Sequence, residues 1–214
     1  MILYHGSDKI IKHPALNKGR VHNDYGQGFY CTRHIELAKE WAVSEERDGF
    51  VNVYEIDTKK LKLLNLNSDE YGILHWLTLL IDNRSLKAGS PIAEDGMIYL
   101  KKNYSIDISD FDGVIGYRAD DSYFSFARAF LSNTISIAQL EQAMYLGDLG
   151  IQYFLKSKKA FELLIYHDSV TVDHLEYYPL KVSRDKKARD DYSHITGSLN
   201  KEEVYLIDLI RRDS

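Results

Sequence analysis

The amino-acid sequence predicts an α+β fold, in which short strands are separated by helices of unequal length. Residues 2–5 are apolar and lead into the turn residues Gly6-Ser7-Asp8, which is typical of a strand end. Residues 50–56 alternate apolar and polar side chains, as a half-buried strand does. Residues 69–81 instead carry apolar side chains at helical spacing. The chain has no internal repeat, and its 214 residues suit one domain with room for an appended subdomain.

The other elements follow from the same spacing rules. A glycine-containing turn is expected at 24–27, a basic polar loop at 181–189, and a helix or strand at 204–210. Further strands are expected at 28–32, 111–117, 151–155 and 163–166, with strand-like runs over 170–182. Further helices are expected at 34–44 with Thr32 as N-cap, at 94–103, at 122–131, at 136–144 with Ser136 as N-cap, and in short form at 158–163.

Composition limits the classes of function. The formal net charge of −5 argues against general nucleic-acid binding, although it leaves room for a local basic groove. Cys31 is the single cysteine, so no internal disulfide can form. No apolar run approaches the roughly 20 residues of a membrane-spanning helix. We therefore expect a cytoplasmic protein without a membrane partner. The sequence has no phosphate-binding Walker loop, zinc-ligand spacing or nucleophile elbow, and no metal site is expected.

Three short motifs carry the candidate chemistry. The first is Tyr-His-Gly-Ser at residues 4–7, at a strand end. The second is Gly-Gln-Gly-Phe-Tyr at 26–30, with Ala38 and Trp41 on the helix behind it. The third is Gln-Tyr-Phe-Leu at 152–155. Their order resembles the diphtheria-toxin and poly(ADP-ribose) polymerase branch of the ADP-ribosyltransferases. It is also similar to an uncharacterised bacterial branch in which the catalytic acid is replaced.

This resemblance covers about residues 2–166 and implies the architecture of that family. We expect a split central sheet with an NAD⁺ groove between its two halves. Residues 67–104 would be a helical insertion over or beside the groove. The ADP-ribosyltransferase-like domain would span 1–167, and a C-terminal extension at 168–214 would pack on it.

The resemblance also implies residue roles in NAD⁺ binding. His5 would hydrogen-bond a hydroxyl of the adenosine ribose, and the backbone of Gly6 would pair with the nicotinamide carboxamide. Tyr30 would present its ring to the nicotinamide, and Trp41 falls where the family has a second stacking aromatic. Ser7 would add a ribose contact. Gly28 belongs to the same binding motif, and Ala38 stands where some relatives carry a serine.

The largest departure is Gln152, which occupies the position of the catalytic glutamate. With His5 and Tyr30 it would complete the catalytic set. A glutamine keeps the hydrogen bond to the ribose 2′-OH but has no charge to stabilise the transition state. This implies a slower enzyme, an inactive one, or another acid in its place. Glu176 is a rival match for the third motif, and Asp120 and Asp121 could orient an acceptor or supply the missing charge.

The function that the resemblance implies is mono-ADP-ribosyl transfer from NAD⁺ to a macromolecule, with release of nicotinamide. A protein acceptor is favoured over a nucleic acid. A bacterial toxin of a toxin–antitoxin or phage-defence system would fit, with an antitoxin as partner. Three alternatives stay open: an NAD⁺ glycohydrolase, a catalytically silent module that binds NAD⁺ or a partner, and a structural interaction protein without nucleotide.

Overall fold

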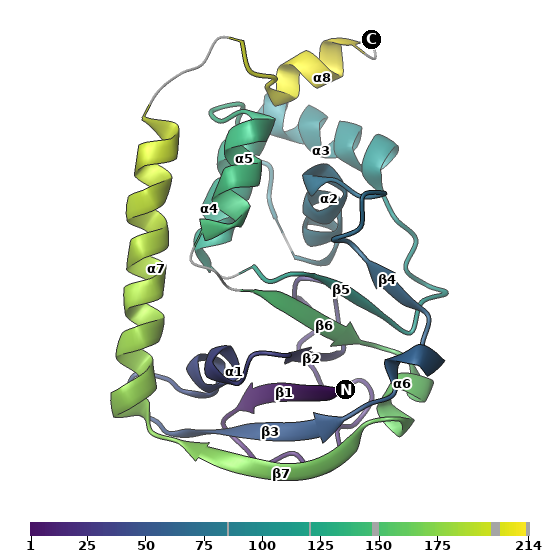
Figure 1. Ribbon diagram of the computed structural model, residues 1–214. Helices are drawn as coiled ribbons and strands as arrows, with labels where there is room; N and C mark the ends of the chain where they lie inside the picture. Colours follow the sequence, from purple (N-terminus) through teal and green to yellow (C-terminus); the bar gives the residue numbers. More distant parts are fainter. Residues whose placement is uncertain (85, 120, 147–149, 198–201, 213–214) are drawn as a thin grey trace.

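A computed structural model of the protein describes residues 1–84, 86–119, 121–146, 150–197 and 202–212, without the side chains of Asp121 and Ser122. Within them, seven strands form one mixed sheet in the order β4-β5-β6-β2-β1-β3-β7 (Figure 1). The strands are β1 (Ile2–Ser7), β2 (Phe29–Thr32), β3 (Gly49–Glu55), β4 (Leu63–Asn65), β5 (Gly113–Tyr117), β6 (Ile151–Leu155) and β7 (Ile165–Val172). The helices are α1 (Ile35–Ala42), α2 (Ile73–Asn83), α3 (Pro91–Tyr104), α4 (Asp121–Leu131), α5 (Ile137–Met144), α6 (Lys158–Glu162), α7 (His174–Thr196) and α8 (Leu206–Arg212). The predicted α+β class is confirmed.

The sheet consists of two halves that meet at one point. Strands β1 and β2 share a single registered pair, Tyr4 with Thr32. In contrast, β1 pairs with β3 over all six of its residues, and β2 pairs with β6 over all four of its own. All neighbours are antiparallel except β4 and β5. The backbone of β1 after Tyr4 is therefore not registered with β2, although both strands continue in opposite directions.

Helices cover one face of the half-sheet β4-β5-β6-β2. The largest core cluster joins Leu64, Val114 and Phe154 of the strands to side chains of α2 to α5 and α8. A smaller cluster on the other face includes Leu3, Tyr54 and Leu155, with Ala160 of α6. Figure 1 shows α2, α3, α4 and α5 grouped above this half of the sheet. As predicted, Ser136 caps α5, and it forms a capping box with Gln139.

The C-terminal region differs from the prediction. The strand-like runs expected at 170–182 are confirmed only for 170–172, where β7 ends. The rest of that range and the loop expected at 181–189 are wrong, because the 23-residue α7 follows. The sequence of α7 is polar, so its apolar side chains do not recur at helical spacing, and Pro179 lies within the helix. Tertiary contacts hold it instead: Arg184 donates bidentately to the buried Glu40 of α1 at 2.8 and 2.9 Å. The predicted boundary at 167/168 falls within β7.

Smaller differences have local causes. The prediction missed β4, which has only three residues and pairs in parallel with β5. Thr32 is not the N-cap of α1, which begins after His34; the Thr32 hydroxyl accepts a hydrogen bond from the His34 backbone N–H instead. Among the described residues, no helix has both the length and the apolar character required to cross a membrane.

Candidate functional site

One pocket of about 720 Å³ brings together most of the predicted site residues. It lies at the junction of the two half-sheets, and its volume falls within the range of small-molecule sites. The predicted residues that line it are His5, Gly6, Ser7, Gly28, Tyr30, Trp41 and Gln152. These residues come from β1, β2, α1 and β6 and from the residue before β2, so the fold collects motifs separated by more than a hundred residues.

The split in the sheet explains how one pocket reaches side chains on both faces. Gln152 is registered with Thr32, and Tyr30 lies two residues from Thr32, so both side chains share its face. Tyr4 also faces that way through its pair with Thr32, which places His5 on the opposite face. Because β1 and β2 are unpaired beyond Tyr4, an opening lies between them, and Gln152 and Tyr30 from one face and His5 from the other can all reach it.

His5 lies in this opening with its hydrogen-bonding roles fixed. Its Nδ1 is 2.7 Å from the backbone carbonyl oxygen of Tyr30, which can only accept, so Nδ1 carries the proton and donates. The ring stacks on Phe29 with 4.2 Å between centroids. Burial lowers the pKa of His5 below its ordinary value of 6.5. The ring is therefore neutral near pH 7, and Nε2 presents a lone pair that can accept a hydrogen bond.

Tyr30 is held by hydrogen bonds at its hydroxyl and by packing of its ring. Its hydroxyl donates to the Gly26 carbonyl oxygen at 2.6 Å and accepts the Tyr25 backbone N–H at 3.1 Å. The ring packs against Phe154 with centroids 4.9 Å apart. Burial raises the pKa of the Tyr30 hydroxyl well above its ordinary value, so it stays neutral. Tyr30 can supply an aromatic surface but no charge.

Gln152 is 3% exposed, and its amide orientation is set by its neighbours. Its Nε2 donates to Asp24 Oδ2 at 2.9 Å and to the Tyr117 carbonyl oxygen at 3.1 Å. Both neighbours are acceptors, so the nitrogen must face them and Oε1 must face away. Among the described residues, no group donates to Oε1. The amide oxygen is thus available to a ligand hydroxyl.

The sequence analysis missed Asp24, a pocket residue that is 2% exposed. Its Oδ1 accepts from Arg84 Nε and Nη2 at 3.1 and 2.7 Å. Its Oδ2 accepts from Gln152 and from the Ala119 backbone N–H, the latter at 3.0 Å. Sequence reasoning assigned Asp24 only to a turn, because its partners lie 60 to 128 residues further along the chain.

Gly6 and Trp41 occupy the pocket in ways that the motif did not predict. A Cβ at Gly6 would lie 2.1 Å from the backbone oxygen of Ala38, so glycine is needed for α1 to pack on β1. The Trp41 ring already has a cation over it, because the Arg118 guanidinium carbon lies 4.0 Å from its centroid. A nicotinamide ring would have to displace Arg118 or use other parts of Trp41.

The pocket is basic although the chain is acidic. Five cationic side chains line it, against the two acids Asp8 and Asp24: Lys18, Arg20, Arg84, Arg118 and Lys181. Asp24 neutralises Arg84. Among the described residues, neither Lys18 nor Arg20 forms an ion pair, and both are exposed. This distribution of charge favours an anionic ligand.

The loop that carries Lys18 and Arg20 is fastened to the sheet. The Asn52 side chain accepts from the Ile11 backbone N–H at 2.7 Å and donates to the Lys9 carbonyl oxygen at 3.0 Å. The Tyr54 hydroxyl donates to the Ile11 carbonyl oxygen. Gln27 Nε2 donates to the carbonyl oxygens of Asn17 and Gly19, both at 2.9 Å. These bonds order the loop before any ligand arrives.

The remaining predicted residues lie elsewhere or in other roles. Ser7 lines the pocket, but its hydroxyl already accepts the Lys9 backbone N–H at 3.3 Å. Glu176 is exposed in the first turn of α7 and does not line the pocket. Asp120 lies outside the described residues. Asp121 begins α4, and its side chain also lies outside them.

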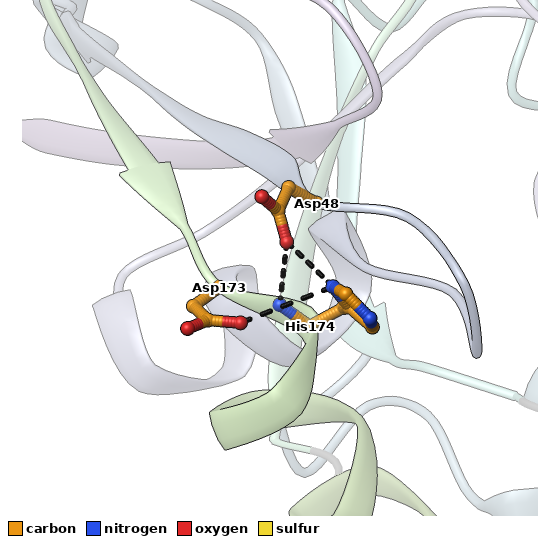
Figure 2. Close-up of side chains that lie close together, drawn as sticks. All are labelled: Asp48, Asp173 and His174. Carbon is orange, nitrogen blue, oxygen red and sulfur yellow. Dashed lines mark hydrogen bonds and ion pairs between the residues drawn. The ribbon is translucent and has the colours of Figure 1, made fainter.

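Asp48, Asp173 and His174 form a second cluster of polar side chains at the start of α7 (Figure 2). Asp173 is the N-cap and accepts from the Leu175 backbone N–H. One oxygen of Asp48 accepts from the His174 backbone at 2.9 Å and contacts its ring Nδ1 at 2.6 Å. These bonds fasten the helix to the β3 end of the sheet, and the cluster is accounted for by capping.

Comparison with known proteins places the chain in a family. A family model described as "Protein of unknown function (DUF3990)" matches residues 1–166. The chain belongs to this family. No curated protein and no solved structure matches it. The matched region includes every residue of the pocket except Lys181.

Proposed function

We propose that this protein binds NAD⁺ in the pocket at the split of its sheet and transfers ADP-ribose to a macromolecule. The observation that carries the proposal is that His5, Tyr30 and Gln152, from three separate motifs, line one pocket. The position of this pocket between two half-sheets fits the ADP-ribosyltransferase arrangement that the motifs resemble.

The polar groups in the pocket match the parts of a dinucleotide. His5 Nε2 and Gln152 Oε1 are hydrogen-bond acceptors, and the two riboses of NAD⁺ offer hydroxyl donors. Lys18 and Arg20 provide exposed positive charge for the pyrophosphate. Tyr30 provides a fixed ring surface for the nicotinamide.

The reaction would proceed by displacement at the nicotinamide ribose. The bond between C1′ and the nicotinamide nitrogen breaks, and its electron pair leaves with nicotinamide. A nucleophilic oxygen or nitrogen of the acceptor bonds to C1′ and loses its proton to solvent water. Gln152 Oε1 would hold the ribose 2′-OH. The Asp24 carboxylate behind the amide increases the partial negative charge on that oxygen.

Asp24 is thus our candidate for the missing acid, acting through Gln152. Arg84 pairs with it and offsets part of its charge. We therefore expect a weaker electrostatic effect than a carboxylate in direct contact with the ribose would give. One preorganised donor or acceptor contributes roughly 3 kcal/mol to such reactions, so the enzyme would be slow.

The Asp24–Arg84 pair also supports a second candidate, a catalytically silent NAD⁺-binding module. The buried acid has a full set of hydrogen-bond donors, which is what a purely structural network requires. Binding of NAD⁺ without nicotinamide release, in the presence of bacterial lysate as a source of acceptors, would favour this candidate. Free ADP-ribose as the product would instead identify an NAD⁺ glycohydrolase.

The direct test measures nicotinamide release from NAD⁺ with and without lysate, for the wild type, Tyr30→Ala, Tyr30→Phe and Gln152→Ala. Tyr30→Phe keeps the ring and should retain NAD⁺ binding, whereas Tyr30→Ala should weaken it. Melting temperatures establish which variants fold. Release that is unchanged in folded Gln152→Ala would refute the proposed role of Gln152. Absence of both release and any NAD⁺-induced melting shift in the wild type would refute the proposal as a whole.

A toxin role is part of the proposal and has its own test. If ADP-ribosylation disables an essential bacterial target, expression of the wild type should stop growth and expression of Gln152→Ala should not. An antitoxin would appear as a neighbouring gene product that restores growth. Normal growth with the wild type, together with active transfer in vitro, would refute the toxin role and leave the activity intact.

A further inference from the structure

A second groove begins where the NAD⁺ pocket ends. Two adjoining pockets of about 470 and 390 Å³ share His34, Asn67 and Ile151 as lining residues. Arg118 lines the second of them and also lines the larger pocket described above. We call the combined surface the lateral groove. The residues used in the argument below are Arg33, His34, Asn67, Tyr117, Arg118 and Tyr145.

The lateral groove concentrates positive charge in a chain of net charge −5. Arg33 and Arg118 line it, and none of its described lining residues is acidic. Arg33 is exposed, and among the described residues it pairs with no carboxylate. Exposed cations in a concave surface without acids are suited to phosphate groups.

The groove also presents aromatic and amide groups. Tyr145 is 66% exposed, and its hydroxyl lies 2.7 Å from that of Tyr117, which fixes the two side chains relative to each other. Their rings meet edge to face, with 5.3 Å between centroids, so the two rings are not stacked flat on each other. The Asn67 side chain is exposed and makes no hydrogen bond within the described part of the chain.

We propose that the lateral groove binds a single-stranded nucleic acid. Phosphates would lie against Arg33 and Arg118, a base would stack on Tyr145, and the amide of Asn67 would hydrogen-bond a base edge. Cations combined with open aromatic faces are the pattern of single-strand binding sites. The wider inference, that this strand is the acceptor of ADP-ribose, rests on the proposed function, whereas the binding itself does not.

A peptide fits the groove less well. Extended peptides commonly bind by adding a strand to a sheet edge. The sheet edge beside this groove is β4, which has only three residues. The expectation of a protein acceptor came from the net charge of the whole chain. The net charge of the whole chain does not reveal the basic lining of the groove, and this lining favours a nucleic acid.

The test measures fluorescence anisotropy of labelled RNA and DNA single strands of about ten nucleotides, a length typical of such sites. A duplex and an acidic peptide of similar length serve as comparison ligands. The full chain is used without NAD⁺. Arg33→Ala and Tyr145→Ala are the test variants. Arg211→Ala is the matched control, because Arg211 is also an exposed arginine but lies on α8, away from the groove.

We expect single strands to bind more tightly than the duplex or the peptide. Tyr145→Ala should weaken binding about tenfold, the scale of one stacked base. Arg33→Ala should lower the slope of log affinity against log salt by about 0.7, the share of one phosphate contact. Arg211→Ala should change neither. Tighter binding of the peptide, no single-strand binding, or equal effects of all three variants would overturn the proposal.

A second readout separates this inference from the proposed function. The same oligonucleotides are incubated with NAD⁺ labelled in its adenylate part, and transfer of the label is followed. Binding without transfer would support the groove and contradict the acceptor role. Transfer that survives in Arg33→Ala and Tyr145→Ala at unchanged rate and strand affinity would contradict the groove while supporting the enzyme.

Discussion

The inner wall and the outer rim of the pocket at the split of the sheet are built in opposite ways. On the inner wall, the buried side chains of Asp24 and Gln152 and the partly exposed Arg84 form a hydrogen-bonded network around the Asp24 carboxylate. On the outer rim, Lys18 and Arg20 are exposed and form no ion pair among the described residues. Both regions line the same pocket.

This difference assigns the two regions different tasks. A buried charge that loses its partner is strongly destabilising, so the inner wall must contribute to the stability of the fold as well as to any chemistry. An exposed lysine or arginine contributes little to folding, so the charges of the rim are available for a ligand. Variants of the wall should therefore lower stability and function together, whereas variants of the rim should affect ligand binding alone.

The largest expected effect is that of Asp24→Ala. Removal of this carboxylate leaves Arg84 and the Ala119 backbone N–H without it as acceptor, and leaves Gln152 Nε2 with the Tyr117 carbonyl oxygen alone. We expect a loss of about 3–5 kcal/mol in the free energy of unfolding, measured by urea denaturation. The control is Asp82→Ala, which breaks the exposed 2.8 Å ion pair with Lys101 and should cost less than about 1 kcal/mol. Equal losses of unfolding free energy in both variants would show that the network around Asp24 stabilises the fold no more than an exposed ion pair does.

The next effect is that of Gln152→Glu. This variant restores the glutamate that the resembled family carries at this position and tests whether the inner wall tolerates its charge. A carboxylate there would face Asp24 Oδ2 and the Tyr117 carbonyl oxygen, where the amide now donates. Repulsion should cost about 2 kcal/mol or more at pH 8. The cost should shrink toward pH 5, because the new carboxyl would have a raised pKa in the fold and would protonate there.

Gln142→Glu on the exposed surface of α5 is the control for this change, and it should be close to neutral. If Gln152→Glu is as stable as the wild type and faster in nicotinamide release, Asp24 is not the functional substitute for a glutamate. The variant therefore shows whether Asp24, acting through Gln152, takes over the role of the glutamate, or whether that role is simply absent.

The comparison of wall and rim also shows what sequence can predict here. Short periodic segments identified most strands and helices, because each depends on local spacing. The residues His5, Tyr30 and Gln152 were found through the order of the motifs that contain them, and the fold placed them in one pocket. Asp24 and Arg84 could not be found in this way, because a buried ion pair across 60 residues leaves no local pattern.

The failure at α7 has the same origin. Residues 174–196 lack a continuous apolar stripe, and the helix depends on Arg184 reaching Glu40 and on Tyr177 packing against α1. Only the tertiary structure supplies these partners. The lateral groove was equally invisible, since its cations and rings come from the β2–α1 turn, from β5 and from the end of α5.

A smaller effect is expected at the rim. Lys18→Ala and Arg20→Ala should leave the free energy of unfolding within about 0.5 kcal/mol of the wild type. Each should weaken NAD⁺ binding about fivefold at low salt, as one exposed charge contact would, and less at high salt. Isothermal titration at two salt concentrations measures this, with Lys59→Ala as an exposed control outside the pocket. Unchanged affinity in both rim variants would remove the assignment of the rim to the pyrophosphate.

The last effect depends on pH and concerns His5, which lines the same pocket. Burial lowers the pKa of His5 in the fold, so the unfolded chain takes up a proton first as the pH falls. The contribution of the neutral ring to stability is present above pH 6.5, and it is lost as the pH falls from there through the folded pKa. The pKa of His75 is lowered in the same way, also through burial, but this residue does not line the pocket.

NAD⁺ should distinguish these two histidines. A ribose hydroxyl that donates to Nε2 of His5 requires the neutral ring, so affinity for NAD⁺ should fall as His5 becomes protonated, by at most about tenfold for each pH unit. We expect this acid-side fall, measured by titration calorimetry, in the wild type and in His75→Gln. It should be absent in His5→Gln, whose affinity should be weaker but constant over the same pH range. The same pH dependence in all three proteins would mean that Nε2 of His5 accepts no hydrogen bond from the ligand.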